Sequence, residues 1–307
     1  MKIHHSIENL PAFRNAVITI GTFDGVHEGH KKIIKALTDE ANAVNGESVI
    51  ITFDPHPRKV IRNDTSLQLI NTLQEKIELL DRTAIDHLVI VPFSLQFAEQ
   101  TADEYIDGFL ISNFHPHTII TGYDHRFGKD RKGSYQLLES KSSQYNYKLV
   151  EIPKHVLDEI DVSSTKIRNA ILHSDIQTAN RLLGYDFFFE GKVVRGDQLG
   201  RKLGFPTANL EYTSSEKIHL GHGVYAVYVD IDAIKYKGML SIGTRPTLSD
   251  PTEKVEVNIF NFDKEIYGRD LKVTVKKYLR AQEKYASLED LIKQLHLDKE
   301  NSFKVLP

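Results

Sequence analysis

The stretch AVITIGTFDGVHEGH, residues 16–30, joins a short apolar run to a glycine-rich segment that carries two histidines. AVITI is typical of a buried strand, and from Glu28 onward the residues EGHKKIIKALTDEA have apolar side chains at helical spacing. The segment between them is therefore a strand-to-helix turn. In parallel α/β folds the loops after the strands share one edge of the sheet, where ligands usually bind. We expect a ligand site at residues 21–30.

The sequence up to about Leu183 repeats this alternation of strands and helices. Apolar runs predict four more strands, at residues 47–53, 87–93, 117–121 and 147–152. Helical spacing predicts helices at residues 31–44, 73–84, 102–114, 134–145 and 176–183. Strands that are almost continuously apolar are typical of a parallel sheet covered on both faces. We predict an α/β domain over residues 1–184, with the boundary near Gly184.

The sequence after Leu183 has a different pattern. Strand candidates follow one another with Gly, Pro and Asp at the breaks, at residues 186–194, 223–231, 236–242, 255–262 and 271–279. One helical run, residues 286–296, lies near the end. We predict a small antiparallel sheet or barrel over residues 185–307.

The composition favours a protein that works on small molecules. The chain has 307 residues, enough for two domains, and 39 basic against 42 acidic residues give a net charge of -3. This balance gives no global reason to expect nucleic acid or an anionic membrane as a partner. The chain has no cysteine, no signal-peptide core and no apolar run near the ~20 residues of a membrane span. We expect a cytoplasmic protein, a monomer or a weak homo-oligomer.

The glycines and histidines of residues 21–30 suit a phosphate. Gly21 and Gly29 let the backbone approach an anion, and the start of the helix offers free N–H groups. His27 and His30 add imidazole donors that stabilise charge developing on phosphorus. Alternatively, His27 caps a turn while His30 faces solvent, and Asp24 only forms a turn. A zinc site is less favoured, because no third ligand occurs at typical spacing.

A second segment, DVSSTKIRNAIL at residues 161–172, opens a predicted helix with three hydroxyl residues. Ser163, Ser164 and Thr165 precede Lys166 and Arg168. Hydroxyls, free N–H groups and two cations suit a polyphosphate. An ordinary N-cap with a solvated basic face is the alternative.

Two further segments follow predicted strands. TFDPHP, residues 52–57, holds His56 in a loop that Pro55 and Pro57 stiffen, or is simply a rigid turn. TGYDHRFGKDRKG, residues 121–133, offers Asp124 and Arg126 as ligand contacts, or is a solvated loop. Because four such segments share one edge of one sheet, we predict a nucleotide site there.

The second half contains the loop EGKVVRGDQLGRKLGFPTANL, residues 190–210. Thr207 and Asn209 are two residues apart, so in an extended chain both side chains leave from one face. Oxygen ligands of this kind suit magnesium, although a tight barrel corner is the alternative. In KVEVNIF, Glu256 lies on the face opposite to Val255 and Val257, either as a general base or as a surface carboxylate.

The four segments GTFDGVHEGH, TFDPHP, TGYDHRFGKDRKG and SSTKIR together resemble the N-terminal half of the bacterial bifunctional riboflavin kinase/FMN adenylyltransferases, also called FAD synthetases. The run GKVVRGDQLGRKLGFPTAN, with GVYAVYV, IGTRPT and VEVNIFNFDKEIYG, is similar to their riboflavin kinase module. The resemblance implies a Rossmann-like nucleotidylyltransferase domain with a parallel sheet, followed by an antiparallel β-barrel kinase domain. It implies phosphorylation of riboflavin to FMN and adenylylation of FMN to FAD, with ATP as co-substrate, pyrophosphate as a product and Mg²⁺ as cofactor.

The resemblance also implies roles for single residues. His27, His30 and Arg168 match catalytic positions of adenylyl transfer, Glu256 matches the base that deprotonates the ribityl hydroxyl, and Thr207 and Asn209 match the magnesium site. Nucleotide contacts are implied at Gly21, Phe23, Asp24, Gly29, Asp124, Arg126, Ser163, Ser164, Thr165, Gly196, Gly200, Arg201, Gly204 and Pro206, and flavin contacts at Phe53, His56, Pro57 and Arg280. The chain departs from the family pattern at His125, Gly221, His222 and Tyr285.

Two other functions remain open from the sequence. The first half could transfer a nucleotide to a different phosphate ester, or the protein could bind flavin without turnover. Thr207, Asn209 and Glu256 argue against binding alone, because storage of a flavin needs neither a magnesium site nor a base.

Overall fold

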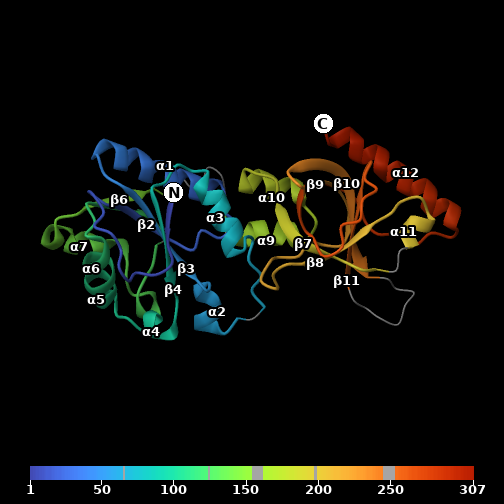
Figure 1. The fold of residues 1–307 in the computed structure, drawn as a ribbon. Coiled ribbons are helices and arrows are strands. Elements are labelled where there is room, and N and C mark those ends of the chain that lie inside the picture. The colour runs from blue at the N-terminus through green and yellow to red at the C-terminus, as the bar shows by residue number, and fades with distance from the viewer. Residues whose placement is uncertain (65, 124, 154–161, 197–198, 245–252) are drawn as a thin grey trace. The chain divides into compact units, whose positions relative to one another are not determined.

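A computed structural model of the chain describes residues 1–307 except residues 65, 124, 154–161, 197–198 and 245–252 (Figure 1). The described residues form two compact units, Met1–Ser163 and Ser164–Pro307. The nucleotide contact predicted at Asp124 lies outside the described residues.

The first unit is built on a six-stranded sheet in the order β1-β4-β3-β2-β5-β6, in which every neighbouring pair is parallel. Its strands are β1 (Lys2–His4), β2 (Val17–Ile20), β3 (Ser48–Asp54), β4 (His87–Pro92), β5 (Thr118–Gly122) and β6 (Lys148–Ile152). The five strands predicted here are confirmed. The short edge strand β1 was not predicted, because its three residues contain no apolar run.

Helices cover both faces of this sheet. They are α1 (Glu28–Ala43), α2 (Pro57–Arg62), α3 (Leu73–Asp81), α4 (Leu95–Ala98), α5 (Ala102–Glu104), the π-helix η1 (Tyr105–Ile111), α6 (Ser112–Phe114), the 3₁₀ turn η2 (Lys129–Arg131) and α7 (Tyr135–Tyr145). Ile18, Val49 and Ile119 pack on one face against η1, α6 and α7. Helix α1 lies on the other side in Figure 1.

The strand order places a topological switch point beside β2. The chain runs outward from β2 to β3 and β4, and then returns to pair β5 with the other side of β2. Ligands of doubly wound sheets bind outside the carboxyl ends of the strands at such a point. The turn at residues 21–30 and the loop after β5 border it.

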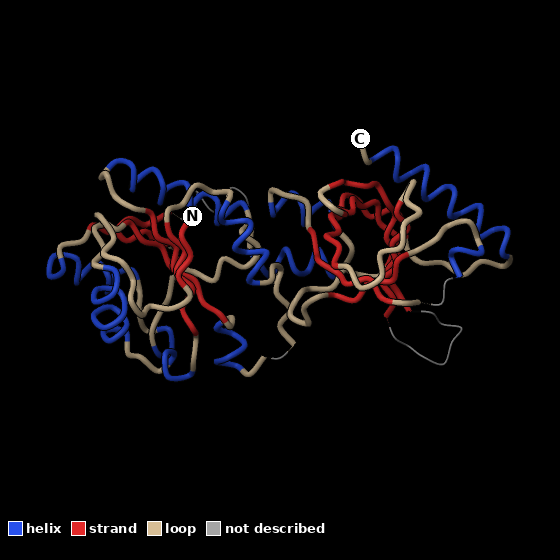
Figure 2. Tube along the Cα trace, in the orientation of Figure 1, coloured by secondary structure: helices blue, strands red, loops and turns tan. Residues whose placement is uncertain are grey.

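The second unit is a closed antiparallel barrel in the order β10-β11-β8-β7-β12-β9 (Figure 2). Its strands are β7 (Phe188–Val194), β8 (Ala208–Tyr212), β9 (Gly223–Ile231), β10 (Ile234–Thr244), β11 (Glu253–Ile259) and β12 (Asp270–Arg280), and a short helix, α11 (Leu199–Lys202), lies between β7 and β8. The C-terminal helix α12 (Leu288–Val305) is longer than predicted. Its last turns are polar, but the Phe303 ring packs 4.9 Å from the Phe260 ring.

Helices α9 (Ser164–Leu172) and α10 (Ile176–Leu183) belong to the same compact unit as the barrel. Asn180 of α10 donates from Nδ2 to the Val275 carbonyl oxygen of β12 at 2.9 Å, and its Oδ1 accepts the Phe187 N–H at 2.8 Å. The domain boundary near Gly184 stays a prediction. Among the described residues, none of the helices has the length and apolar character needed to cross a membrane.

Candidate active sites

The turn after β2 holds both histidines in a fixed arrangement, with His27 buried and His30 partly buried. His27 is the N-cap of α1, and its Nδ1 accepts the backbone N–H of His30 at 3.3 Å. A neutral ring that accepts at Nδ1 carries its proton on Nε2. The rings of His27 and His30 stack with centroids 3.6 Å apart, and the Phe23 ring lies 5.0 Å from that of His30.

Both histidines are neutral at pH 7. Burial lowers the pKa of His27 to about 4, against weaker opposing effects of Asp24 and Glu28. Burial also places the pKa of His30 well below its ordinary value, and His27 and Lys76 lower it further. Each ring is therefore an uncharged hydrogen-bond donor and not a cation.

Close packing explains the glycine between the histidines. A Cβ on Gly29 would lie 3.0 Å from Val162 and 3.3 Å from the His27 ring. A Cβ on Gly21, directly after β2, would lie 3.1 Å from the Phe23 ring. Both glycines thus have a packing role whether or not a phosphate approaches them.

Asp24 connects the turn to the segment before α3. Its carboxylate is buried, and Oδ1 accepts the backbone N–H groups of Ile70 at 3.0 Å and Asn71 at 3.3 Å. These bonds hold the start of α3 against the turn. Direct contact of Asp24 with a nucleotide stays a prediction.

The TFDPHP segment ends β3 and begins α2. Phe53 is buried against the rings of Phe93 and Phe97 at 5.4 and 5.7 Å. His56 is the N-cap of α2, with Nδ1 accepting the Arg58 N–H at 3.1 Å, and Pro57 is the first helical residue. The fixed position expected for His56 is observed, while its contact with flavin stays a prediction.

The loop after β5 closes as a short hairpin-like bridge. Phe127 and Gly133 exchange backbone hydrogen bonds, and the Phe127 ring lies 5.7 Å from the ring of His125. Arg126 is exposed, and its Nη1 donates to the His125 carbonyl oxygen. His125 thus takes the position of an aromatic residue beside Phe127.

The SSTKIR segment falls on both units. Ser163 ends the first, whereas Ser164, Thr165 and Arg168 lie on α9 of the second. The predicted convergence of these residues with His27 joins two separately described units and stays a prediction.

In the barrel, strand pairing brings the predicted base and a predicted metal ligand together. Glu256 of β11 is the register partner of Asn209 of β8. Directly opposed residues of an antiparallel pair have Cβ atoms roughly 4.5–5.5 Å apart and point to the same face. The structure thus makes Glu256 and Asn209 neighbours by backbone hydrogen bonding, as the kinase prediction requires.

Gly196, just after β7, lies directly against the Asn209 side chain. A Cβ on Gly196 would be 2.2 Å from Asn209 Nδ2, so any other residue at this position displaces the Asn209 amide. The strand that follows is also fixed, because Asn258 Nδ2 donates to the Pro206 carbonyl oxygen at 2.6 Å. Gly204 has a φ of 80° in the turn between them.

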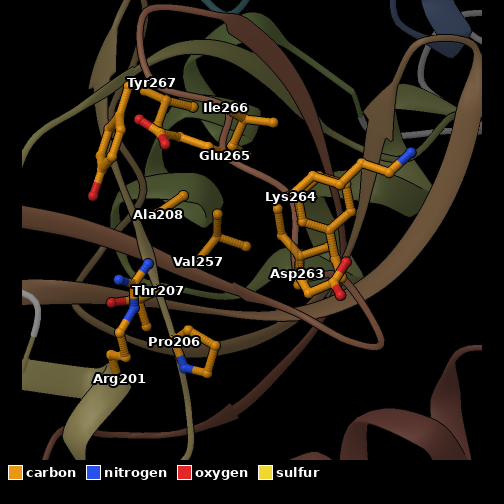
Figure 3. Close-up of a pocket in the computed structure, with 13 residues that line it drawn as sticks. Arg201, Pro206, Thr207, Ala208, Val257, Asp263, Lys264, Glu265, Ile266 and Tyr267 are labelled. Carbon is orange, nitrogen blue, oxygen red and sulfur yellow. The ribbon is translucent and has the colours of Figure 1, made fainter.

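Two cavities open in the barrel, and Thr207 lines both. The first barrel cavity, of about 420 Å³, is lined by Val193, Arg201, Pro206, Thr207, Ala208, Val257, Ile259 and residues 262–267. Figure 3 shows Arg201 and Thr207 across this cavity from Glu265 and Tyr267. The second barrel cavity, of about 560 Å³, is lined by Gly200, Thr207, Glu256, Arg280 and Tyr285, among others. Both volumes are in the range of small-molecule sites.

Arg280, predicted to bind flavin, is held by an ion pair in the second barrel cavity. Its Nε and Nη2 donate to the two carboxylate oxygens of Asp298 at 2.9 and 2.6 Å. Asp298 is 1% exposed on α12 and also accepts from Gln294. The Arg280 guanidinium lies 5.8 Å from the centre of the Tyr285 ring, one of the departures from the family pattern.

The other departures lie at one end of the barrel. Gly221 donates its N–H to the Ile171 carbonyl oxygen, and a Cβ on it would be 2.4 Å from the Leu172 carbonyl oxygen. His222 Nε2 lies 3.1 Å from Glu253, whose other oxygen lies 3.1 Å from His219 Nδ1. Hydrogen bonding by His219 is the main cause that lowers the pKa of Glu253.

The sequence did not single out Lys76. It lies on α3, is 6% exposed and acts electrostatically on His30. Its spacing from Leu79 and Leu80, both buried, was a signal that it occupies the inner face of the helix.

A parallel sheet with neutral imidazoles at its switch point, followed by a closed barrel that pairs the Glu256 carboxylate with the Asn209 amide, fits a two-domain phosphate-transferring enzyme. Models of two families match the chain, FAD synthetase over residues 10–166 and riboflavin kinase over residues 183–306.

Proteins similar along the whole chain agree with these matches. The bifunctional riboflavin kinase/FMN adenylyltransferase of Escherichia coli K12 is 32% identical over 97% of this chain and 96% of its own. That of Buchnera aphidicola from Schizaphis graminum is 35% identical over the same shares. A crystal structure of a Streptococcus pneumoniae protein described as a macrolide-efflux protein has a TM-score of 0.87 at 30% identity and covers 98% of both chains.

The chain belongs to the bifunctional riboflavin kinase/FMN adenylyltransferase family. Its riboflavin kinase activity converts riboflavin and ATP to FMN, and its FMN adenylyltransferase activity converts FMN and ATP to FAD and pyrophosphate.

Proposed function

We propose that riboflavin phosphorylation takes place at the junction of the two barrel cavities, with Glu256 as base and Thr207 and Asn209 as magnesium ligands. The observation that carries this proposal is the register pairing of Glu256 with Asn209, next to a threonine that lines both cavities. ATP would occupy the first barrel cavity, near Gly196, Arg201, Gly204 and Pro206, and riboflavin the second, beside Arg280.

The residues present fit magnesium. A threonine hydroxyl and an asparagine amide are oxygen donors, and Mg²⁺ is usually bound by few protein ligands together with phosphates and water. Among the described residues, no group of three or more His, Asp or Glu side chains forms a metal site. When bound, the ion would neutralise charge on the β- and γ-phosphates. Glu256 would accept the proton of the ribityl hydroxyl while that oxygen attacks the γ-phosphorus and ADP leaves.

Adenylyl transfer needs no strong base, because the phosphate of FMN is already ionised. We assign His27 and His30 as neutral donors to the α-phosphate of ATP, with Ser163, Ser164, Thr165 and Arg168 binding the phosphates. What supports this is the proton on His27 Nε2, which the bond between His30 N–H and Nδ1 fixes. The flavin would lie beside Phe53, His56 and Pro57 at the end of β3.

These assignments are tested by separating the two activities. Glu256→Gln should slow riboflavin phosphorylation by roughly 10² or more while FAD formation from supplied FMN continues. His30→Ala should slow FAD formation by ~10² or more and leave FMN formation unchanged. Glu289→Gln and His5→Ala, at exposed positions, are matched controls. Equal loss of both activities in either folded variant would refute the separation of sites.

The domain boundary, the partners and the cellular location are also proposals. The two activities would divide near Gly184, which is the second residue of the region matched by the riboflavin kinase model. A balanced charge supports small molecules as the partners, without nucleic acid or membrane, in a cytoplasmic monomer or weak homo-oligomer.

A further inference from the structure

Lys76 is a buried lysine in the first unit. It lies in the first turns of α3, is 6% exposed and shares the inner face of the helix with Leu79 and Leu80. Among the residues that the structure describes, its Nζ atom makes no hydrogen bond and no ion pair within 4.0 Å. Lysines are rarely buried without a partner, because an unpaired buried charge is costly.

The charged and polar groups around Lys76 come from three different segments. Burial lowers the pKa of Lys76, and the nearby carboxylates of Asp24 and Asp54 act in the opposite direction. Lys76 also acts on the ring of His30. Asp24 lies in the turn after β2, Asp54 is the last residue of β3, and His30 is in the first turn of α1. These are the segments at the carboxyl edge of the sheet.

The position of Lys76 is fixed by the start of its helix. Asp24 holds the backbone of Ile70 and Asn71, as described above. Thr72 and Glu75 then form a capping box, with Glu75 N–H donating to Thr72 Oγ1 at 3.2 Å and Thr72 N–H to Glu75 Oε2 at 2.9 Å. Lys76 follows directly on this capping box, so its backbone is held in a helix whose start is hydrogen-bonded to Asp24 in the turn after β2.

The reaction at this edge brings two anions together, and its nearest donors carry no charge. ATP and FMN both carry phosphates, while His27 and His30 are neutral and Asp24 and Asp54 repel anions. Among Asp24, His27, His30, Asp54 and Lys76, only Lys76 can be a cation at neutral pH. We propose that Lys76 binds the β- and γ-phosphates of ATP during adenylyl transfer and stabilises the pyrophosphate that leaves.

The step balances without a proton from Lys76. A bond forms between a phosphate oxygen of FMN and the α-phosphorus of ATP, and the bond from the α-phosphorus to the bridging oxygen breaks. That oxygen leaves on pyrophosphate with the electron pair, and the ammonium donates hydrogen bonds to it. An ordered ammonium is a strong ligand for developing negative charge. This proposal depends on the assignment of His30 to the nucleotide site.

The decisive experiment asks whether Lys76 binds phosphate or only neutralises the nearby carboxylate of Asp54. We would compare Lys76→Met, Lys76→Arg and the double variant Asp54→Asn/Lys76→Met in the full chain. The double variant removes one negative and one positive charge, so the local balance is kept and folding is favoured. FAD formation from FMN and Mg-ATP is measured, with inorganic pyrophosphate as product inhibitor and FMN formation from riboflavin as the internal reference.

If Lys76 binds phosphate, Lys76→Met and the double variant both lose ~10² or more in kcat/KM for ATP in FAD formation. Inhibition by pyrophosphate weakens by roughly tenfold or more in both, equivalent to about 1.4 kcal/mol. Lys76→Arg retains more of both properties, and FMN formation is unchanged throughout.

Two results would overturn the proposal. Recovery of FAD formation and pyrophosphate inhibition in the double variant would show that Lys76 only balances Asp54. Unchanged pyrophosphate inhibition in folded Lys76→Met would exclude a phosphate contact. Full FAD synthesis by His30→Ala would instead refute the underlying assignment of the site, so the two failures are distinguishable.

Discussion

Replacing His27 by asparagine should make the first unit less sensitive to acid. Asparagine is a good N-cap, so the variant keeps a side-chain acceptor at the start of α1 but does not titrate. Burial lowers the pKa of His27 from 6.5 to about 4. Between these two pH values the unfolded chain binds a proton that the native protein does not, so stability is lost as the pH falls.

The size of the effect follows from the two pKa values. Each unit of difference corresponds to about 1.4 kcal/mol, so His27 contributes a loss of about 2 kcal/mol between pH 7 and pH 5, and about 3 kcal/mol by pH 4. His30 titrates in the same direction because its pKa is also lowered by burial. Wild type should therefore lose about 2 kcal/mol more than His27→Asn on going from pH 7 to pH 5.

Hydrogen exchange of the full chain measures this difference locally. Peptides covering β2 and α1 report the opening free energy of the first unit, after correction for the pH dependence of intrinsic exchange. Peptides from β9 in the barrel are the control and should respond alike in both proteins. Equal losses in the two proteins would refute a buried neutral His27, as would an NMR titration of His27 near ~6.5, the value for a solvated ring.

Further predictions concern the barrel. Gly196→Ala places a Cβ 2.2 Å from Asn209 Nδ2 and should slow riboflavin phosphorylation by roughly 10² through misplacement of the amide, measured as kcat for FMN formation. Gly108→Ala is the matched control, because a Cβ there meets nothing within 4 Å. Asp298→Asn keeps the shape of the side chain but weakens its ion pair with Arg280. We expect the KM for riboflavin to rise. The free energy of unfolding of the barrel should fall by roughly 1–3 kcal/mol. An unchanged KM and denaturation midpoint would show that Asp298 does not position Arg280.

The sequence predicted the strands of both units well, because their signals are local. Runs such as SVIITFD are apolar on both faces, and GVYAVYVDI matches β9 at both ends. Elements held by distant contacts were not predicted. Strand β1 pairs with β4, and in the last turns of α12 the Phe303 ring contacts Phe260, which is distant in sequence.

The arrangement of the site residues could not be predicted either, because it depends on contacts between segments that are distant in sequence. Residue types and spacing located His27, His30, Thr207 and Asn209, but the stacking of the two histidine rings and the pairing of Glu256 with Asn209 depend on register and turn geometry. A charged residue within LQEKIELL resembles an exposed helix position. Its spacing from Leu79 and Leu80 indicates the inner face of the helix, and the packing of α3 shows that Lys76 is buried there.

The pairing of β8 with β11 affects how the kinase site can change by mutation. Because the backbone ladder sets the separation of the Glu256 and Asn209 backbones, changes in the surrounding loops that keep Gly196 leave this pair in place. Inserting one residue within either strand reverses the side chains beyond it and removes the pair at once. The site should therefore tolerate substitutions in these loops, other than at Gly196, better than insertions or deletions within the two strands.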